Sequence, residues 1–214
     1  MIINHGVRGS IPTPSHKMLG YGGNTICVEV RTSDYQLIFD CGSGFSKVDF
    51  DNDLQTIVFI SHFHHDHIQG LAFNDYKSAP DKKIILTSAH SDKKTTFSNL
   101  FNYYKLPYFP VSFLDIINKF EFYEFDQVVH NFKDLNINSI DLNHPGNSKG
   151  YSIISDHKKF CYLLDNEFQN NQKSKVIKFC NYSDTVIWDG MYLDSELKDK
   201  RGWGHSSVEQ GIDI

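Results

Sequence analysis

The chain has 214 residues, long enough for one sizeable hydrophobic core, and we expect a single domain over residues 1–214. Apolar residues make up 40% of the chain, yet no apolar run approaches the roughly 20 residues of a membrane span, so we expect no membrane partner. A formal net charge of -5 disfavours a long nucleic acid as partner, because a phosphate backbone is bound by clustered Lys and Arg.

The predicted elements indicate an α/β fold. The first residues, Met1 to His5, carry neither the basic nor the long apolar segment of a secretory signal, so we expect a cytoplasmic location. Runs rich in β-branched and aromatic residues predict strands at 25–30, 36–39, 56–60, 83–86, 137–142, 151–154, 160–164 and 185–188. Apolar residues at helical spacing predict helices at 91–104, 171–180 and 194–200. This mixture favours two sheets packed face to face with helices outside.

Histidines are concentrated directly after the predicted strand at 56–60, in the run Ser61-His62-Phe63-His64-His65-Asp66-His67. Burying so many imidazoles with a carboxylate is costly without partners, whereas their nitrogen and oxygen atoms are ligands that suit zinc or manganese. Alternate side chains of an extended segment share one side, so we expect His62 and His64 to face one ion. After a bend, Asp66 and His67 would face a second ion. A solvated histidine-rich loop is the alternative.

Three later residues stand where predicted strands end or a helix begins. His144 follows the strand at 137–142 and precedes the turn-forming pair Pro145-Gly146, which would orient its imidazole. Asp165 follows the strand at 160–164, and His205 precedes a predicted helix start after Ser207. Because strand ends bring distant residues to one edge of a sheet, we expect these side chains to join the metal centre.

The order H-x-H-x-D-H, strand-end His, strand-end Asp and late His resembles the metallo-β-lactamase superfamily. The resemblance implies an αββα sandwich of the metallo-β-lactamase type. It also implies that one divalent ion is bound by His62, His64 and His144, the other by Asp66, His67 and His205, and that Asp165 bridges them. Zinc is the expected metal, with manganese as the alternative.

Four further segments look like the phosphodiesterase branch of that superfamily: residues 5–12, 21–25, 39–44 and 107–111. Within it, the chain most resembles cyclic-nucleotide phosphodiesterases, including phage enzymes that defeat bacterial Pycsar immunity. The resemblance implies hydrolysis of 3′,5′-cyclic nucleotides to linear monophosphates by a homodimer, in the host cytoplasm if the enzyme is phage-encoded. Since relatives continue for another strand and helix, we expect a C-terminus that is shortened, or covered by a neighbouring surface.

Individual roles follow from this expected chemistry. A two-metal centre lowers the pKa of a bound water toward roughly 7, and we expect Asp66 to act catalytically by orienting that water and accepting its proton. Arg8 and Tyr108 are candidate substrate contacts, although Arg8 could instead bind carbonyls of its own loop. Asp40 and Asp189 are expected to accept hydrogen bonds from metal-bound imidazoles, with turn capping as the alternative.

Other functions remain open at this point. One is hydrolysis of another small phosphodiester, such as a phosphoribosyl cyclic phosphate, although the scattered Cys27, Cys41, Cys161 and Cys180 do not form the extra cysteine-rich metal site of those relatives. Another is transfer-RNA 3′ processing, which calls for a basic patch. A non-catalytic cyclic-nucleotide sponge is a third. The aromatic stretch 97–113 would stack a base, seal a homodimer or pack in the core.

Overall fold

The computed structural model describes residues 1–76, 78, 83–110 and 112–214. It divides into two compact units, Met1–Val128 and Val129–Ile214. The division falls inside helix α4 (Phe125–Asn131), and the assignment of the whole chain to a single domain stays a prediction. Val111, the last residue of the 107–111 segment, lies outside the described residues. Within the described part, no helix is both long enough and apolar enough to cross a membrane.

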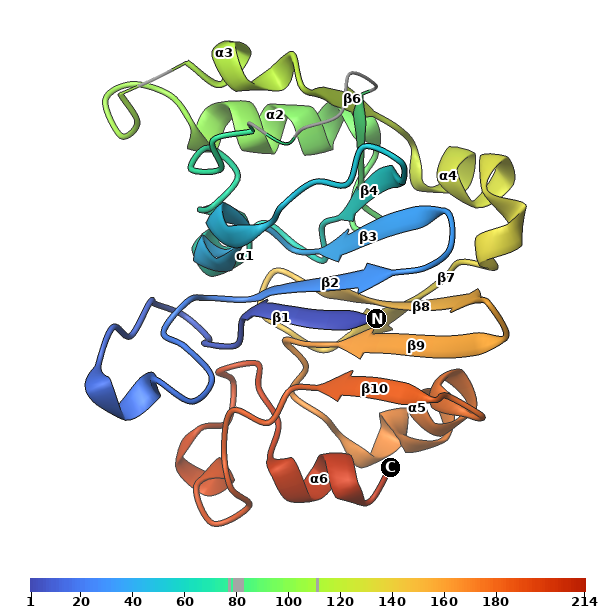
Figure 1. Cartoon of the computed structure of the whole chain (residues 1–214). Helices are drawn as coiled ribbons and strands as arrows, with labels where there is room; N and C mark the ends of the chain where they lie inside the picture. The colour runs from blue at the N-terminus through green and yellow to red at the C-terminus, as the bar shows by residue number, and fades with distance from the viewer. Residues whose placement is uncertain (77, 79–82, 111) are drawn as a thin grey trace. The chain divides into compact units, whose positions relative to one another are not determined.

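Unit 1 contains a mixed sheet whose strands follow one another in sequence order (Figure 1). Its strands are β1 (Ile2–Gly6), β2 (Cys27–Arg31), β3 (Tyr35–Phe39), β4 (Gln55–Phe59), β5 (Ile84–Thr87) and β6 (Phe120–Phe122). The first three strands are antiparallel neighbours, whereas β3 to β6 are parallel. The carboxyl ends of those parallel strands therefore lie at one edge of the sheet.

Strands β3 and β4 run through the core of unit 1 in a register that positions polar residues just beyond their ends. Phe39 pairs with Phe59, and their rings stack with centroids 5.3 Å apart. The next residue after β3, Asp40, donates its backbone N–H to the carbonyl of Phe59. This places the Asp40 carboxylate beside Ser61 and the histidine-rich loop, which leave β4 at the same edge.

Helices of unit 1 supply much of its aromatic core. They are α1 (His65–Ile68), α2 (Lys93–Tyr103), α3 (Phe113–Ile117) and the first half of α4, with 3-10 turns η1 (His16–Met18) and η2 (Ser43–Lys47). Figure 1 shows α2 beside α3, near β6. Phe97 of α2 packs against Phe113 of α3 and Phe122 of β6, with ring centroids 6.2 and 5.6 Å away. Contact among these rings, of which Phe113 is fully buried, holds α2 against the sheet.

Unit 2 contains a second sheet with the strand order β10-β9-β8-β7. Its strands are β7 (Asn138–Leu142), β8 (Ser148–Ser155), β9 (Lys158–Leu163) and β10 (Thr185–Trp188). Strands β7, β8 and β9 are antiparallel, and β10 is parallel to β9. Its helices are α5 (Lys173–Cys180), α6 (Val208–Ile212) and the 3-10 turns η3 (Lys133–Leu135), η4 (Asn170–Gln172) and η5 (Leu197–Asp199).

These elements confirm the predicted α/β class, with one helix prediction wrong. Each predicted strand overlaps an observed one, and the run 185–188 is β10 with the same bounds. The predicted helix at 194–200 contains only the short 3-10 turn η5, in which no residue is buried. Strands β1 and β6 and helices α1, α3 and α4 were not predicted.

Candidate metal centre

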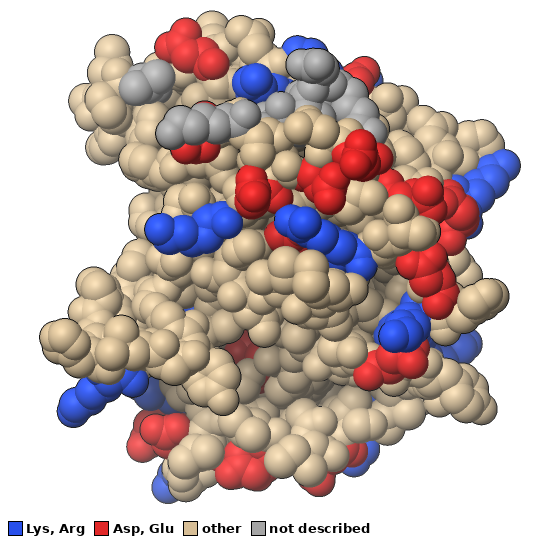
Figure 2. Space-filling model, in the orientation of Figure 1, with Lys and Arg blue, Asp and Glu red and all other residues tan. Residues whose placement is uncertain are grey.

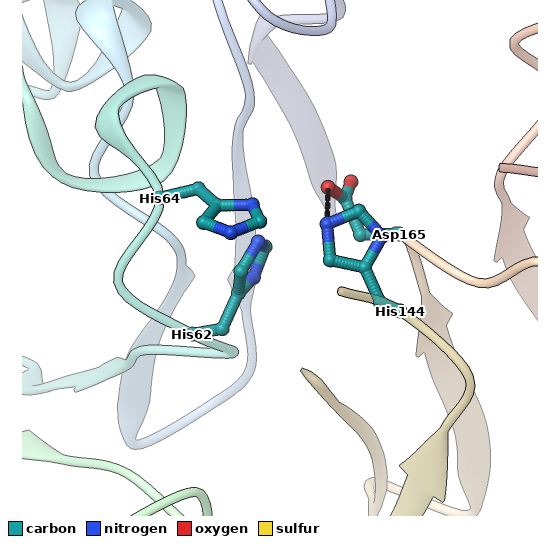
Figure 3. Close-up of side chains that lie close together, drawn as sticks. All are labelled: His62, His64, His144 and Asp165. Atoms are coloured by element: carbon teal, nitrogen blue, oxygen red, sulfur yellow. Dashed lines mark ion pairs between the residues drawn. The ribbon is translucent and has the colours of Figure 1, made fainter. Parts of the chain in front are cut away.

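The loop that leaves β4 holds the first part of the candidate site. His62 is 2% exposed, whereas His64 is exposed and is the N-cap residue of α1. Their rings meet edge to face with centroids 4.4 Å apart, as Figure 3 shows. The ring of His67, in α1, lies 4.2 Å from that of His62. Helix α1 thus provides the predicted bend and folds His67 back toward the two loop histidines.

Asp40 and Ser61 fix the orientation of the buried imidazoles. Asp40 Oδ2 lies 2.7 Å from Nδ1 of His67 and accepts the Ser61 hydroxyl at 2.7 Å. The other oxygen, Oδ1, accepts the Ser61 backbone N–H at 2.7 Å. Since the Ser61 hydroxyl donates to Asp40, it accepts from Nδ1 of His62 at 3.0 Å. The hydrogen bonds of His62 and His67 therefore place a proton on Nδ1 of each ring, which leaves Nε2 as the atom that could bind a metal ion.

Asp66 occupies the first turn of α1 and is 7% exposed. Its Oδ2 accepts the backbone N–H of Ser10 at 2.7 Å and lies 3.6 Å from Nε2 of His67. Ser10 has a positive φ of 62°, which lets the loop turn its N–H toward the carboxylate. One oxygen of Asp66 is thereby held beside a histidine nitrogen that has a lone pair. We call His62, His64, Asp66 and His67 the unit 1 group.

Unit 2 presents a matching arrangement after β7 and β9. His144 Nδ1 donates to the carbonyl oxygen of Gly204 at 2.7 Å, because a carbonyl can only accept. Its Nε2 lies 3.2 Å from Oδ2 of Asp165, the contact drawn as a dashed line in Figure 3. Both side chains are almost fully buried. Asp165 and Asp40 share a left-handed backbone, with φ of 56° and 59°, and such strained residues are concentrated at functional sites.

His205 completes the unit 2 group, which we define as His144, Asp165, Asp189 and His205. Its Nδ1 lies 2.9 Å from Oδ2 of Asp189, which also accepts the backbone N–H of Asn166 at 3.0 Å. One potential ligand atom each of Asp165, Asp189 and His205 lies within 4.8 Å of the others. Helix α6 begins three residues after His205, with the Ser207 and Gln210 side chains forming a capping box. The predicted helix start is therefore confirmed.

The two candidate substrate contacts differ in their surroundings. Nε of Arg8 donates to the carbonyl of Gly22 at 2.9 Å, the loop-fixing contact that the sequence left open as an alternative. Tyr108 is 85% exposed and lines a pocket of unit 1. His5, which has no metal-site spacing, lies 2.6 Å from the buried carboxylate of Glu29.

The donor atoms in both units suit a divalent ion. In each unit an imidazole is anchored through Nδ1 and has Nε2 facing an aspartate oxygen, at 3.6 Å in unit 1 and 3.2 Å in unit 2. A cation between such atoms satisfies both, and nitrogen and oxygen donors are those preferred by zinc and manganese. The sequence did not predict the hydrogen bonds made by the Gly204 carbonyl and the Ser10 N–H. Every residue has such backbone groups, so residue type does not reveal which of them contact the site.

Comparison with known proteins supports the assignment of the fold that the histidine motif suggested. No protein-family model matches the chain. A curated ribonuclease Z of Thermoplasma acidophilum is 32% identical over 133 residues, covering 54% of this chain and 38% of that protein. The chain thus spans well under two thirds of the length of this curated relative.

Solved structures extend the likeness over nearly the whole chain. The short form of human tRNase Z has a TM-score of 0.69 at 18% identity, covering 99% of this chain and 86% of that one. The metallo-β-lactamase fold protein YhfI of Bacillus subtilis has a TM-score of 0.65 at 16% identity, covering 96% and 77%. At such identities the likeness concerns the fold. With its mixed α/β structure and two sheets, the chain has the metallo-β-lactamase fold, as its histidine motif predicted.

Proposed function

We propose that this chain is a metal-dependent phosphodiesterase that binds two divalent ions through His62, His64, Asp66, His67, His144, Asp165 and His205. The observation that carries the proposal is the pattern common to both units. His67 is held through Nδ1 by Asp40 and has Nε2 facing Asp66, and His144 is held by Gly204 and has Nε2 facing Asp165. Oriented imidazoles beside buried carboxylates are typical of metal ligands with their supporting contacts.

The ligand assignment within this proposal follows the order of the motif. One ion would be held by His62, His64 and His144, the other by Asp66, His67 and His205, with Asp165 between them. Asp40 and Asp189 would orient His67 and His205 through the hydrogen bonds described above. Zinc suits this set of nitrogen and oxygen donors, and manganese is the alternative.

Asp66 has the catalytic role in this proposal. When bound, the metal ions would supply Lewis acidity and a water molecule acidic enough to lose a proton near neutral pH. The Asp66 carboxylate, held by the Ser10 N–H at 2.7 Å, would orient that water and accept its proton. Because Ser10 engages Oδ2, the second oxygen Oδ1 is the candidate proton acceptor.

For the substrate, we propose 3′,5′-cyclic nucleotides, hydrolysed to linear monophosphates. The net charge of -5 favours a small anion held by metal over a long polyanion held by basic side chains. Figure 2 shows Lys and Arg interspersed with Asp and Glu on the drawn face. The proposal includes a cytoplasmic homodimer and, if the chain is phage-encoded, removal of the cyclic-nucleotide signal of Pycsar immunity.

Transfer-RNA 3′ processing is the second candidate, and a specific observation favours it. The curated relative is named ribonuclease Z, and its 32% identity covers 54% of this chain. The two candidates make the same demand on the metal centre, because both reactions are hydrolysis of a phosphodiester. They differ in the size of substrate that the surrounding surface must bind.

One substrate panel separates the candidates. Purified protein, loaded with zinc or manganese, is incubated with cyclic AMP, GMP, CMP and UMP, and separately with a precursor transfer RNA bearing a 3′ trailer. Products are resolved by chromatography or gel, with chelated protein and His64→Ala as controls. Linear monophosphates formed only by the metal-loaded wild type support the first candidate, and trailer cleavage supports the second. Absence of both, with two metals bound, would overturn both substrate assignments.

A further inference from the structure

Unit 1 has a pocket of about 670 Å³ that the metal chemistry does not use. We call it the aromatic pocket. It is lined by side chains from α1 and its C-cap, from the end of α2 and from the loops that follow, including His65, Gln69, Phe73, Asn102, Tyr108 and Phe109. Its volume falls within the roughly 300–1,000 Å³ that is usual for small-molecule sites.

Two aromatic rings of the pocket are exposed to solvent, and one of them, Phe73, contacts Phe109. Phe73 is 65% and Tyr108 is 85% exposed, whereas Tyr104, which also lines the pocket, is 1% exposed. Phe109 connects the buried ring of Tyr104 with the exposed ring of Phe73. Its own ring lies edge to face with both, with centroids 4.8 Å from Tyr104 and 5.7 Å from Phe73. Exposed flat rings backed by buried ones offer a preformed stacking surface, which suits a planar heterocycle.

Two amide side chains add a hydrogen-bond acceptor and a hydrogen-bond donor to the aromatic pocket. Gln69 Nε2 donates to the Thr25 hydroxyl at 3.1 Å, which identifies its Oε1 as the acceptor that it can offer. Asn102 Oδ1 accepts from Lys105 at 2.8 Å, which identifies its NH₂ group as the donor. A nucleobase edge presents both donors and acceptors, so this pair matches a base better than a purely apolar ligand.

The aromatic pocket adjoins the unit 1 group. His65, which lines the pocket, stands between His64 and Asp66 in the sequence, and its Nδ1 contacts the Tyr103 hydroxyl. Burial raises the pKa of Tyr103, and the nearby negative charge of Asp66 raises it further. The pocket therefore lies beside the residues proposed to bind metal, where the phosphate of a nucleotide would be held by the ions.

We propose that the aromatic pocket binds the nucleobase of the substrate, stacked against Phe73 or Tyr108, with Gln69 and Asn102 at the base edge. This rests on the proposed function, because it assigns the phosphate to the adjacent metal centre. It makes a base-bearing nucleotide the substrate class and disfavours base-free sugar phosphates.

Binding of reaction products tests the assignment without relying on turnover. Metal-loaded protein is titrated calorimetrically with adenosine, guanosine, cytidine and uridine 5′-monophosphates and with ribose 5-phosphate, which lacks a base. Stacking on an aromatic side chain corresponds to roughly tenfold or more in affinity per base. We expect at least one nucleotide to bind about tenfold or more tightly than ribose 5-phosphate, and we expect Phe73→Ala or Tyr108→Ala to remove that preference.

Two further variants serve as controls. Tyr108→Phe keeps the ring and should keep the preference, and Tyr182→Ala removes a ring that is 92% exposed in unit 2 and should leave it unchanged. Equal affinity for nucleotides and ribose 5-phosphate, or a preference that survives both alanine substitutions, would overturn the pocket assignment. Base preference in a protein that hydrolyses no phosphodiester would overturn only the proposed function.

Discussion

Asp40 Oδ2 lies 2.7 Å from Nδ1 of His67, joining the end of β3 to the helix that carries the second half of the histidine motif. The same carboxylate accepts both the backbone N–H and the hydroxyl of Ser61. Asp40 is completely buried. A buried carboxylate with three donors is strongly constrained, so this residue fixes the geometry of the unit 1 group rather than capping a turn alone.

Asp40→Asn should weaken metal binding. An amide can keep some of the contacts to Ser61, but it holds the His67 tautomer less firmly, and loss of such a supporting partner costs about 10- to 100-fold in metal affinity. Competition with a chromogenic chelator measures the change. Asp53→Asn, at an exposed position of the same unit, is the matched control and should bind metal normally. Equal affinities of the two variants would contradict the orienting role.

A pair of glycines gives a sharper test in unit 2. Gly202 and Gly204 both have positive φ, 81° and 85°, and both donate their backbone N–H to Glu167. A Cβ at Gly204 would lie 2.2 Å from His144 Nδ1, whereas a Cβ at Gly202 meets nothing within 4 Å. We expect both alanine variants to lose roughly 1–2 kcal/mol of stability from backbone strain, but only Gly204→Ala to lose metal affinity.

The readouts are chemical unfolding and metal titration on the same preparations. If Gly204→Ala binds metal as tightly as Gly202→Ala, the contact between His144 and the Gly204 carbonyl does not support a metal ligand.

The sequence nominates candidate ligands, but it does not show the contacts that orient them. Residue type and spacing predict His62, His64, Asp66 and His67 as one group, and the folded chain places the ring of His62 beside those of His64 and His67. The contacts that orient them come partly from backbone, such as the Ser10 N–H, and only the folded chain brings these together. A sequence pattern can therefore nominate candidate ligands without showing how their side chains are held.

Two predictions of secondary structure from local sequence differ from the observed elements, because burial and strand pairing, more than composition, determine those elements. The residues of η5 resemble a helix in composition, but none is buried, so no apolar face stabilises a longer helix there. Strand β1 has mostly exposed or partly exposed residues and pairs along one side with β2. The sequence of β1 lacks the apolar run of a central strand. The strand forms because its backbone pairs with β2, which its composition does not reveal.

Glu29 should make the stability of the fold depend on pH. Burial is the largest influence on this carboxyl and opposes its ionisation, but hydrogen bonds from His5, Arg31 and Gln36 outweigh it and lower the pKa. A group with a lowered folded pKa stabilises the fold above its unfolded pKa, about 4.3 for Glu. That stabilisation is lost as pH falls from there through the folded value.

Glu29→Gln should therefore be less stable than wild type at neutral pH, and its stability should fall less steeply on acidification below about pH 4.3. Urea unfolding from neutral to acidic pH measures both quantities. Glu121→Gln, at an exposed position of β6, is the control and should follow the wild-type curve. Parallel curves for Glu29→Gln and wild type would show that this carboxyl does not contribute to the acid sensitivity.

Turnover should depend on Asp66 beyond its contribution to metal binding. Asp66→Asn keeps the size of the side chain and an oxygen for the Ser10 N–H, but it removes the negative charge and the ability to accept a proton. General-base catalysis contributes about 100- to 10,000-fold, so kcat should fall by at least about 100-fold. Turnover is measured together with metal content, so that loss of catalysis can be separated from loss of metal. Near-normal turnover by Asp66→Asn or Asp66→Ala with metal bound would assign proton transfer to another group and leave Asp66 as a ligand alone.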